Sequence, residues 1–148
     1  MKHAAIGRLK GHIQDLPANL QSFTPESLQE PRVPGKWSRI QIVGHLVDSA
    51  TRNLIRFQEV QFHPAPYRLT PYPQEDLVQA NFYQEASKED LLSLWAALNQ
   101  QIVFVLEQLP EEALKWSMDI GEGEIKDMDF WIEDYVGHLE HHLQQIFE

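Results

Sequence analysis

Residues 38–57, SRIQIVGHLVDSATRNLIRF, decide the fold of this chain because they specify one long amphipathic helix. Ser38 with Gln41 three residues later matches a capping box, in which each side chain binds a free backbone N–H at the helix start. Apolar residues then recur at three- and four-residue intervals, the spacing of one helix face: Val43, Leu46, Val47, Ala50, Leu54 and Phe57. The pattern predicts a helix from Ser38 to about Phe62, ended by the proline-rich residues 63–66.

Three other stretches repeat this apolar spacing. The first covers residues 2–20, where Pro17 must kink the helix or end it near Leu16. The next opens at Ser87 and stops at Pro110, and the last runs from Asp127 or Asp129 almost to the final residue. Four helices of this kind predict an all-α four-helix bundle. A chain of 148 residues is expected to form it as one domain, residues 1–148.

The connections between these helices carry less pattern. Residues 63–73 hold four prolines and predict extended structure without regular pairing, and residues 74–84 are expected to form a short helix. Long irregular segments are often functional lids, and a plain surface crossover between two helices is the other interpretation. Residues 111–126 include a flexible turn, Gly-Glu-Gly-Glu, at 121–124.

Composition excludes several functions. The formal net charge of −10 repels nucleic acid and anionic membrane surfaces, so neither is expected as a partner. No stretch approaches the roughly 18 apolar residues of a membrane span, and the first residues lack the apolar core of a signal peptide. The chain has no cysteine, which excludes disulfides and thiolate ligands and fits a cytoplasmic protein.

Two histidines in the last predicted helix are the clearest chemical signal. His138 and His142 lie one turn apart on the flank of the apolar stripe, whereas His141 falls opposite the stripe and is expected to face solvent. Neutral imidazoles at this spacing suit zinc, nickel, copper or iron. Histidines that are merely packed or exposed are the alternative. Glu140 lies far from this pair, and the His-Glu-x-x-His motif of zinc proteases is absent.

His45 in the second predicted helix gives mixed evidence. A helical wheel places it about 150° from the middle of the apolar stripe. It is therefore predicted to be exposed, or to lie under a lid or a partner chain, and not to line the bundle centre. Asp48, three residues later, is a candidate fourth ligand or an acceptor for an imidazole N–H. An ion pair with Arg52 is its ordinary alternative role.

Four sequence segments together resemble the DinB/YfiT-like superfamily. They are GKWS at 35–38, GHLVDS at 44–49, RNLIRF at 52–57 and HxxxHxxQI at 138–146. The resemblance implies a four-helix bundle in up-down-down-up order with a long crossover connection. It also implies a divalent metal site, holding zinc or nickel, whose ligands map onto His45, His138 and His142. Dimers are common in this superfamily, so a homodimer is a further expectation.

The resemblance also implies two classes of function. Some relatives transfer low-molecular-weight thiols such as bacillithiol to electrophiles, and others are called metal-dependent hydrolases or are stress-induced with no known activity. We therefore expect a metal-dependent transferase acting with a small thiol on electrophilic molecules, or alternatively a hydrolase or a non-catalytic metal-binding bundle. Asp48 would orient a ligand, and Arg52 or Arg56 would hold an anionic substrate group. No residue is singled out as catalytic.

Overall fold

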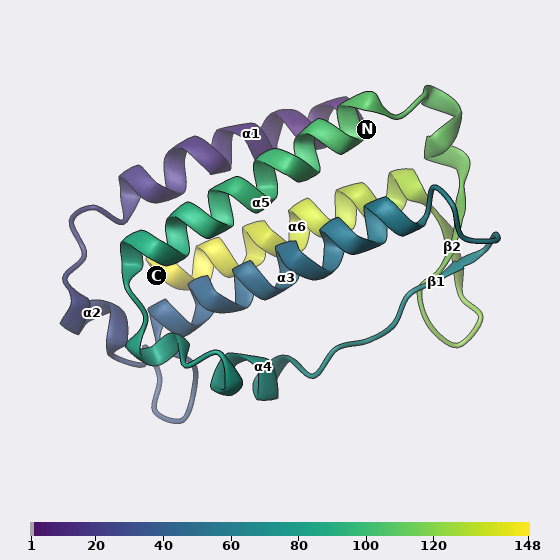
Figure 1. Cartoon of the computed structure of the whole chain (residues 1–148). Helices are drawn as coiled ribbons and strands as arrows, with labels where there is room; N and C mark the ends of the chain where they lie inside the picture. Colours follow the sequence, from purple (N-terminus) through teal and green to yellow (C-terminus); the bar gives the residue numbers. More distant parts are fainter. Residues whose placement is uncertain (1) are drawn as a thin grey trace.

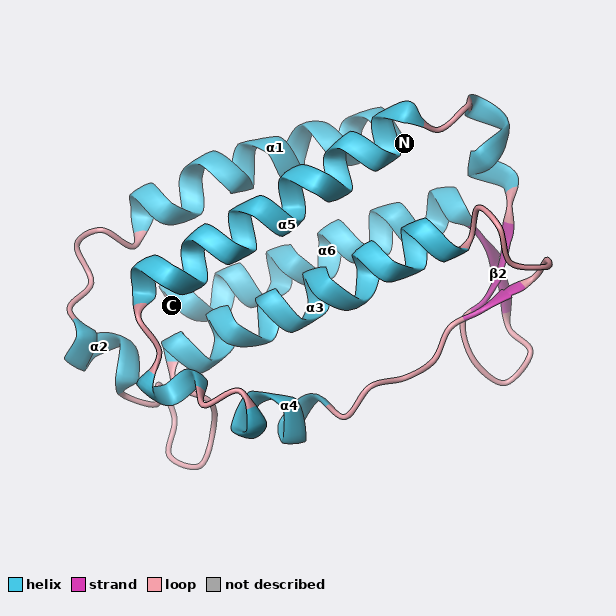
Figure 2. Cartoon of the chain, viewed as in Figure 1, coloured by secondary structure: helices cyan, strands magenta, loops and turns pink. Residues whose placement is uncertain are grey.

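Four long helices pack side by side in the computed structural model, which describes residues 2–148 (Figures 1 and 2). The long helices are α1 (Lys2–Asn19), α3 (Arg39–Glu59), α5 (Lys88–Gln108) and α6 (Met128–Phe147). The shorter helical elements are α2 (Pro25–Gln29), α4 (Gln74–Ala80), η1 (Tyr83–Glu85) and η2 (Glu111–Lys115), and the strands are β1 (Tyr67–Arg68), β2 (Ser117–Asp119) and β3 (Ile125–Asp127). The predicted all-α four-helix bundle is confirmed.

The long helices follow the expected up-down-down-up order. In Figure 1, α1 and α6 run in one direction and α3 and α5 in the other. The two parallel neighbours, α3 and α5, are therefore joined by a crossover, residues 60–87, that returns along the length of the bundle. This crossover carries β1, α4 and η1, and α4 and η1 pack against α3.

The helix starts form as their sequence signals predict. In the capping box of α3, Ser38 Oγ accepts a hydrogen bond from the Gln41 backbone N–H (3.3 Å), and Gln41 Oε1 accepts one from the Ser38 N–H (2.9 Å). Ser87 Oγ caps α5 by accepting from the Asp90 N–H, and Asp127 Oδ1 caps α6 by accepting from the Phe130 N–H, each without the reciprocal bond of a capping box. Such a cap stabilises a helix by about 1 kcal/mol, which explains why these boundaries are readable from local sequence.

One local alternative is excluded and one local prediction is wrong. Of the two effects predicted for Pro17, a kink or an end near Leu16, the structure excludes the end, because α1 continues to Asn19. Residues 63–73 are not free of pairing: β1 pairs in parallel with β2, in the register Tyr67 with Met118. Strand β2 also pairs antiparallel with β3, and Gly121 and Gly123 adopt positive φ in the turn that joins them.

The crossover changes the surroundings of α3. Every residue from Ile42 to Ala50 is buried, although an amphipathic helix exposes one face when it packs on one side only. The cover is tight at Gly44, where an added Cβ would lie 2.1 Å from Cγ of Tyr83 in η1. Glycine at this position lets the crossover approach the helix. No helix among residues 2–148 is long and apolar enough to cross a membrane.

Candidate metal centre

His45, His138 and His142 converge between α3 and α6. One ring nitrogen of each lies within 4.8 Å of the corresponding nitrogens of the other two. The Nε2 atoms of His138 and His142 are 3.2 Å apart, and the His45 ring centroid is 4.7 Å from that of His142 and 5.5 Å from that of His138. The structure thus brings together the three histidines that the sequence analysis selected.

The spacing suits a small divalent cation. Zinc–nitrogen bonds of about 2.0–2.1 Å in tetrahedral geometry separate the ligand nitrogens by about 3.3 Å. The 3.2 Å between Nε2 of His138 and Nε2 of His142 is close to this value. The nitrogens of all three histidines lie within 4.8 Å of one another, so a small movement of His45 would bring its nitrogen to the same separation.

His45 is fully buried, and neither of its ring nitrogens has a hydrogen-bond partner among the described residues. Leaving a buried donor or acceptor unsatisfied costs about 1–3 kcal/mol. A metal ion held by His45 would satisfy one of these nitrogens. Packing alone does not explain a buried imidazole without hydrogen-bond partners. The unpartnered His45 ring is therefore the strongest sign that these residues could hold a metal.

The burial of His45 excludes one of the alternatives that the sequence left open. The helical wheel left exposure, or a position under a lid or a partner chain, as alternatives, and the burial of His45 rules out exposure. Trp37, just before α3, places its indole 4.9 Å from the His45 ring. The Trp37 Nε1–H donates to Glu75 of α4 (3.0 Å), which ties this cover to the crossover.

Burial also sets the charge of the three imidazoles. Desolvation, and then the neighbouring histidines, lower the pKa of His45 to about 3. Desolvation likewise lowers the pKa of His138 to about 4, and it lowers that of His142 despite the hydrogen bond to Gln145. All three rings are therefore neutral at pH 7, the state in which imidazole binds metals.

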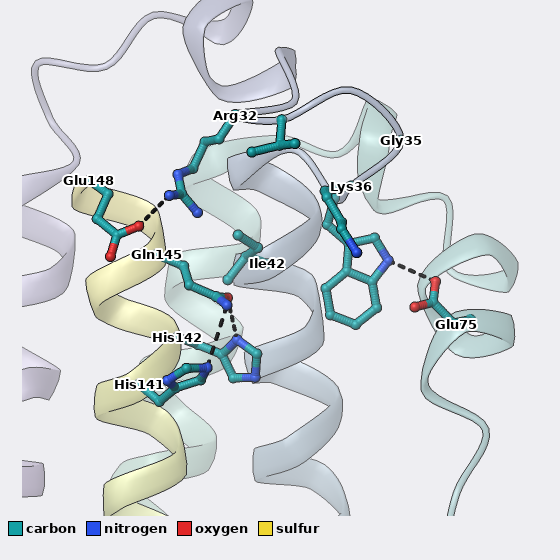
Figure 3. A pocket seen from close by; sticks show the side chains of 11 residues that line it. Arg32, Gly35, Lys36, Ile42, Glu75, His141, His142, Gln145 and Glu148 are labelled. Atoms are coloured by element: carbon teal, nitrogen blue, oxygen red, sulfur yellow. Dashed lines mark hydrogen bonds and ion pairs between the residues drawn. The ribbon is translucent and has the colours of Figure 1, made fainter.

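Gln145 orients one ligand. Its Oε1 accepts a hydrogen bond from Nδ1 of His142 (2.8 Å; Figure 3). This arrangement leaves Nε2 of His142, which lies 3.2 Å from Nε2 of His138, with a free lone pair. His141 is exposed, as predicted, and its Nε2 lies 3.4 Å from the Gln145 amide. The sequence analysis missed the role of Gln145, although its i, i+3 spacing from His142 was a usable signal.

Asp48 has different partners from those expected. Its Oδ1 accepts hydrogen bonds from the Tyr83 hydroxyl (2.6 Å) and from Asn81 Nδ2 (3.2 Å), and its Oδ2 is buried without a partner. Among residues 2–148 it forms neither a hydrogen bond to the three histidines nor an ion pair with Arg52. Burial raises the pKa of the Asp48 carboxyl. Asp48 therefore ties η1 to α3 and does not orient an imidazole.

Two separate pockets reach the histidines. One, of about 550 Å³, is lined by His142 and by residues of the loop before α3, including Arg32 and Lys36 (Figure 3). The other, of about 240 Å³, is lined by His138 together with Arg56 and Asp134. The site consequently lies at a flank of the bundle with access for small molecules.

Asp134 is a polar residue of this site that the sequence analysis did not find. It precedes His138 by four residues on α6, so both side chains project from one helix face into the smaller pocket. Burial raises the pKa of its carboxyl. Asp134 and His138 have the same i, i+4 spacing as His138 and His142. Glu140, in contrast, binds Arg8 and His12 away from the site.

Comparison with known proteins agrees with this architecture. The family model described as the DinB superfamily matches residues 8–146. The fold is similar to the solved structure of YfiT from Bacillus subtilis, described as a probable metal-dependent hydrolase with an unusual four-helix bundle topology. The two chains share 24% sequence identity with a TM-score of 0.89, over 99% of this chain and 83% of the other. No curated protein sequence matches the chain.

Proposed function

The chain belongs to the DinB superfamily, and from that membership and the converging histidines we propose that it is a divalent-metal-dependent enzyme that transfers a low-molecular-weight thiol to electrophilic small molecules. The observation that carries the proposal is the buried, unpartnered His45 facing His138 and His142. Zinc or nickel is the metal we expect, because neutral imidazole suits both.

The metal supplies one chemical effect when bound: it lowers the pKa of a thiol or a water molecule held beside the three imidazoles. His45, His138 and His142 hold the cation, and Gln145 keeps His142 in the required tautomer. The two pockets give separate approaches for two small reactants. His45 is fully buried beside Trp37, so water is excluded from that side of the site.

Asp134 is the residue we assign as proton acceptor. Its carboxylate lines the pocket that His138 also lines, and its raised pKa makes it a better base than an ordinary aspartate. In the transfer, the thiol sulfur forms a bond to the electrophilic carbon, and the leaving group departs with the electron pair of the bond that breaks. The thiol proton passes to a carboxylate oxygen of Asp134 and then to solvent.

Hydrolysis is the second candidate, because the similar solved structure is described as a probable metal-dependent hydrolase. The same residues serve this reaction. The water oxygen forms a bond to the acyl carbon, Asp134 takes a water proton, and the leaving alcohol receives a proton as its bond to the acyl carbon breaks. A bundle that binds metal without catalysing either reaction is the third candidate, and a homodimer stays a prediction.

The first experiment measures bound metal and two activities on the same preparation. The purified protein is analysed for metal by mass spectrometry, then loaded with zinc or nickel. Thiol conjugation is followed with monochlorobimane and several small thiols, and hydrolysis with 4-nitrophenyl acetate. His138→Ala and His142→Ala are expected to lose the metal and the activity, whereas His141→Ala, on the exposed side of the same helix, keeps both.

Each outcome decides between the candidates. Conjugation that depends on the three histidines supports the transferase, and ester cleavage without conjugation favours the hydrolase. Full metal occupancy with neither activity favours the non-catalytic bundle. Metal binding that survives unchanged in both histidine variants would refute the site itself.

A further inference from the structure

Two arginines beside the smaller pocket form no close ion pair with a carboxylate among residues 2–148, although the protein is acidic. The chain has 22 acidic and 12 basic residues other than histidine, so carboxylates are abundant. Arg8, for example, pairs with both Glu133 and Glu140. Within residues 2–148, however, neither Arg52 nor Arg56 has a carboxylate oxygen within 4.0 Å. Arg56 is half-buried, and a half-buried cation without a counter-ion indicates a place where an anion from outside can bind. Arg52 is exposed, and its charge partly offsets the burial that raises the pKa of the nearby Asp48 carboxyl.

Arg56 is held in a fixed orientation. Its guanidinium lies over the Trp131 ring (5.5 Å to the centroid) and over the Tyr72 ring (5.8 Å), and it donates one hydrogen bond to the Thr70 carbonyl oxygen (2.8 Å). Arg52 lies over the same Tyr72 ring at 5.7 Å. Because Arg stacks on aromatic faces through its plane, its N–H edge stays available for a planar anion. Burial and the nearby positive charge of Arg52 lower the pKa of Arg56.

The rest of the pocket wall is equally well ordered. Asn53 accepts a hydrogen bond from the Trp131 indole N–H (2.9 Å) and donates one to the Ser49 carbonyl oxygen (2.9 Å). These bonds fix the wall between Arg56 and His138, both of which line the pocket. A ligand would therefore meet a rigid surface and lose little binding energy to ordering of the protein.

Asp134 limits the charge that the pocket accepts. It lines the same pocket, and it does not form an ion pair with Arg56. Its carboxylate would repel a second negative charge, so a dianion such as phosphate is disfavoured relative to a monoanion. The volume of about 240 Å³ admits a small molecule only.

We propose that this pocket binds a small molecule through a single carboxylate, held by the guanidinium of Arg56 with support from Arg52, so that the remainder of the molecule lies beside His138. The inference rests on the proposed function in one respect: it assigns the bound molecule as the electrophilic substrate. The binding step itself requires only the residues of α3, the crossover and α6 that form the pocket.

The binding test uses propionate, its neutral isostere propionamide, and phosphate. Each is titrated into ¹⁵N-labelled full-length protein while the Trp131 indole N–H resonance is followed. We expect propionate to bind more tightly than propionamide or phosphate. Arg56→Gln should weaken propionate binding about ten- to hundredfold and leave propionamide unchanged. Arg52→Gln should weaken it severalfold, and Lys115→Gln, at an exposed position outside the pocket, should have no effect.

Turnover provides the second readout. Iodoacetate and iodoacetamide carry the same leaving group and differ in charge, so the ratio of their kcat/KM values in the metal-loaded protein reports the carboxylate preference. Arg56→Gln is expected to lower that ratio about tenfold. Arg56→Lys keeps the charge but not the planar guanidinium, so its kcat/KM ratio should lie between those of the wild type and Arg56→Gln. If Arg56→Gln fails to fold, the comparison of propionate, propionamide and phosphate on the wild type still decides the inference.

The two proposals fail in different ways. Propionate binding that depends on Arg56 in a protein without metal or turnover supports this inference and removes the proposed function. Turnover with equal preference for both iodo compounds, or equal binding of propionate and propionamide, overturns this inference alone.

Discussion

The histidines of α6 and the histidine of α3 reach the same site by different routes. His138 and His142 are half-buried neighbours on one helix, and their i, i+4 spacing brings their Nε2 atoms to 3.2 Å from each other. His45 is fully buried, and its ring lies against Trp37 and against His142 of α6. One part of the site is thus a local property of a helix, and the other is a product of the whole fold. The two should respond differently to the same perturbations.

The largest expected effect separates metal affinity from stability. His45→Ala and His142→Ala should each weaken zinc binding more than about a hundredfold, because each removes one ligand of three. In the metal-free protein, His45→Ala should also lower the free energy of unfolding by about 2 kcal/mol through a buried cavity, and His142→Ala by less than about 1 kcal/mol. Chelator competition and urea unfolding measure the two quantities. Equal losses of stability would contradict the distinction, and His141→Ala is the control.

The pH dependence of the metal-free protein should sharpen the same contrast. The pKa of His45 is about 3 in the folded state and about 6.5 when unfolded, so between these values only the unfolded chain carries the proton. Stability is complete above pH 6.5 and falls as the pH drops toward 3, by up to about 1.4 kcal/mol per pH unit for this group. Urea unfolding across this range is the measurement. A His45→Leu variant should show a shallower fall, and an unchanged slope would show that His45 is accessible to protons.

Gly44→Ala tests whether the crossover is what buries His45. The added methyl group would collide with the Tyr83 ring, which lies 2.1 Å from the Cβ position, and should cost about 1–3 kcal/mol of stability. Displacement of Tyr83 should expose His45 and raise its pKa toward 6.5, which NMR titration measures. The matched control is Gly137→Ala on α6, where no atom lies within 4 Å of the Cβ position. A His45 pKa that stays low in Gly44→Ala would assign the burial to Trp37 instead.

The smallest expected effect concerns Gln145. Gln145→Leu removes the acceptor for Nδ1–H of His142, and it should weaken zinc binding about tenfold without changing the stability of the metal-free protein by more than about 0.5 kcal/mol. Competition with a chelator and urea unfolding give the two values. Gln144→Leu, at an exposed neighbouring position, is the control. A loss of affinity in both variants would point to a general effect on α6.

Much of the fold was predictable because its signals are local. The capping box at Ser38 and the caps at Ser87 and Asp127 formed as their side chains predict. The pairing of Tyr67 with Met118 was not predictable, because the two strands are two and three residues long and far apart in the sequence. The sequence left open whether Pro17 kinks the first helix or ends it, because a proline ring weakens a helix without always ending it, and α1 continues beyond it to Asn19.

For the candidate site, local spacing was enough to select His138 and His142 and to set His141 aside, whereas Asp134 was not predicted. Whether His45 faces solvent could not be decided in that way, because a helical wheel describes one helix against one core. Only the tertiary structure places α4, η1 and Trp37 over the outer face of α3 and leaves both His45 nitrogens without partners. The physical reason is the range of the interactions: caps and i, i+4 pairs act within one turn, whereas burial depends on every element that packs around a residue.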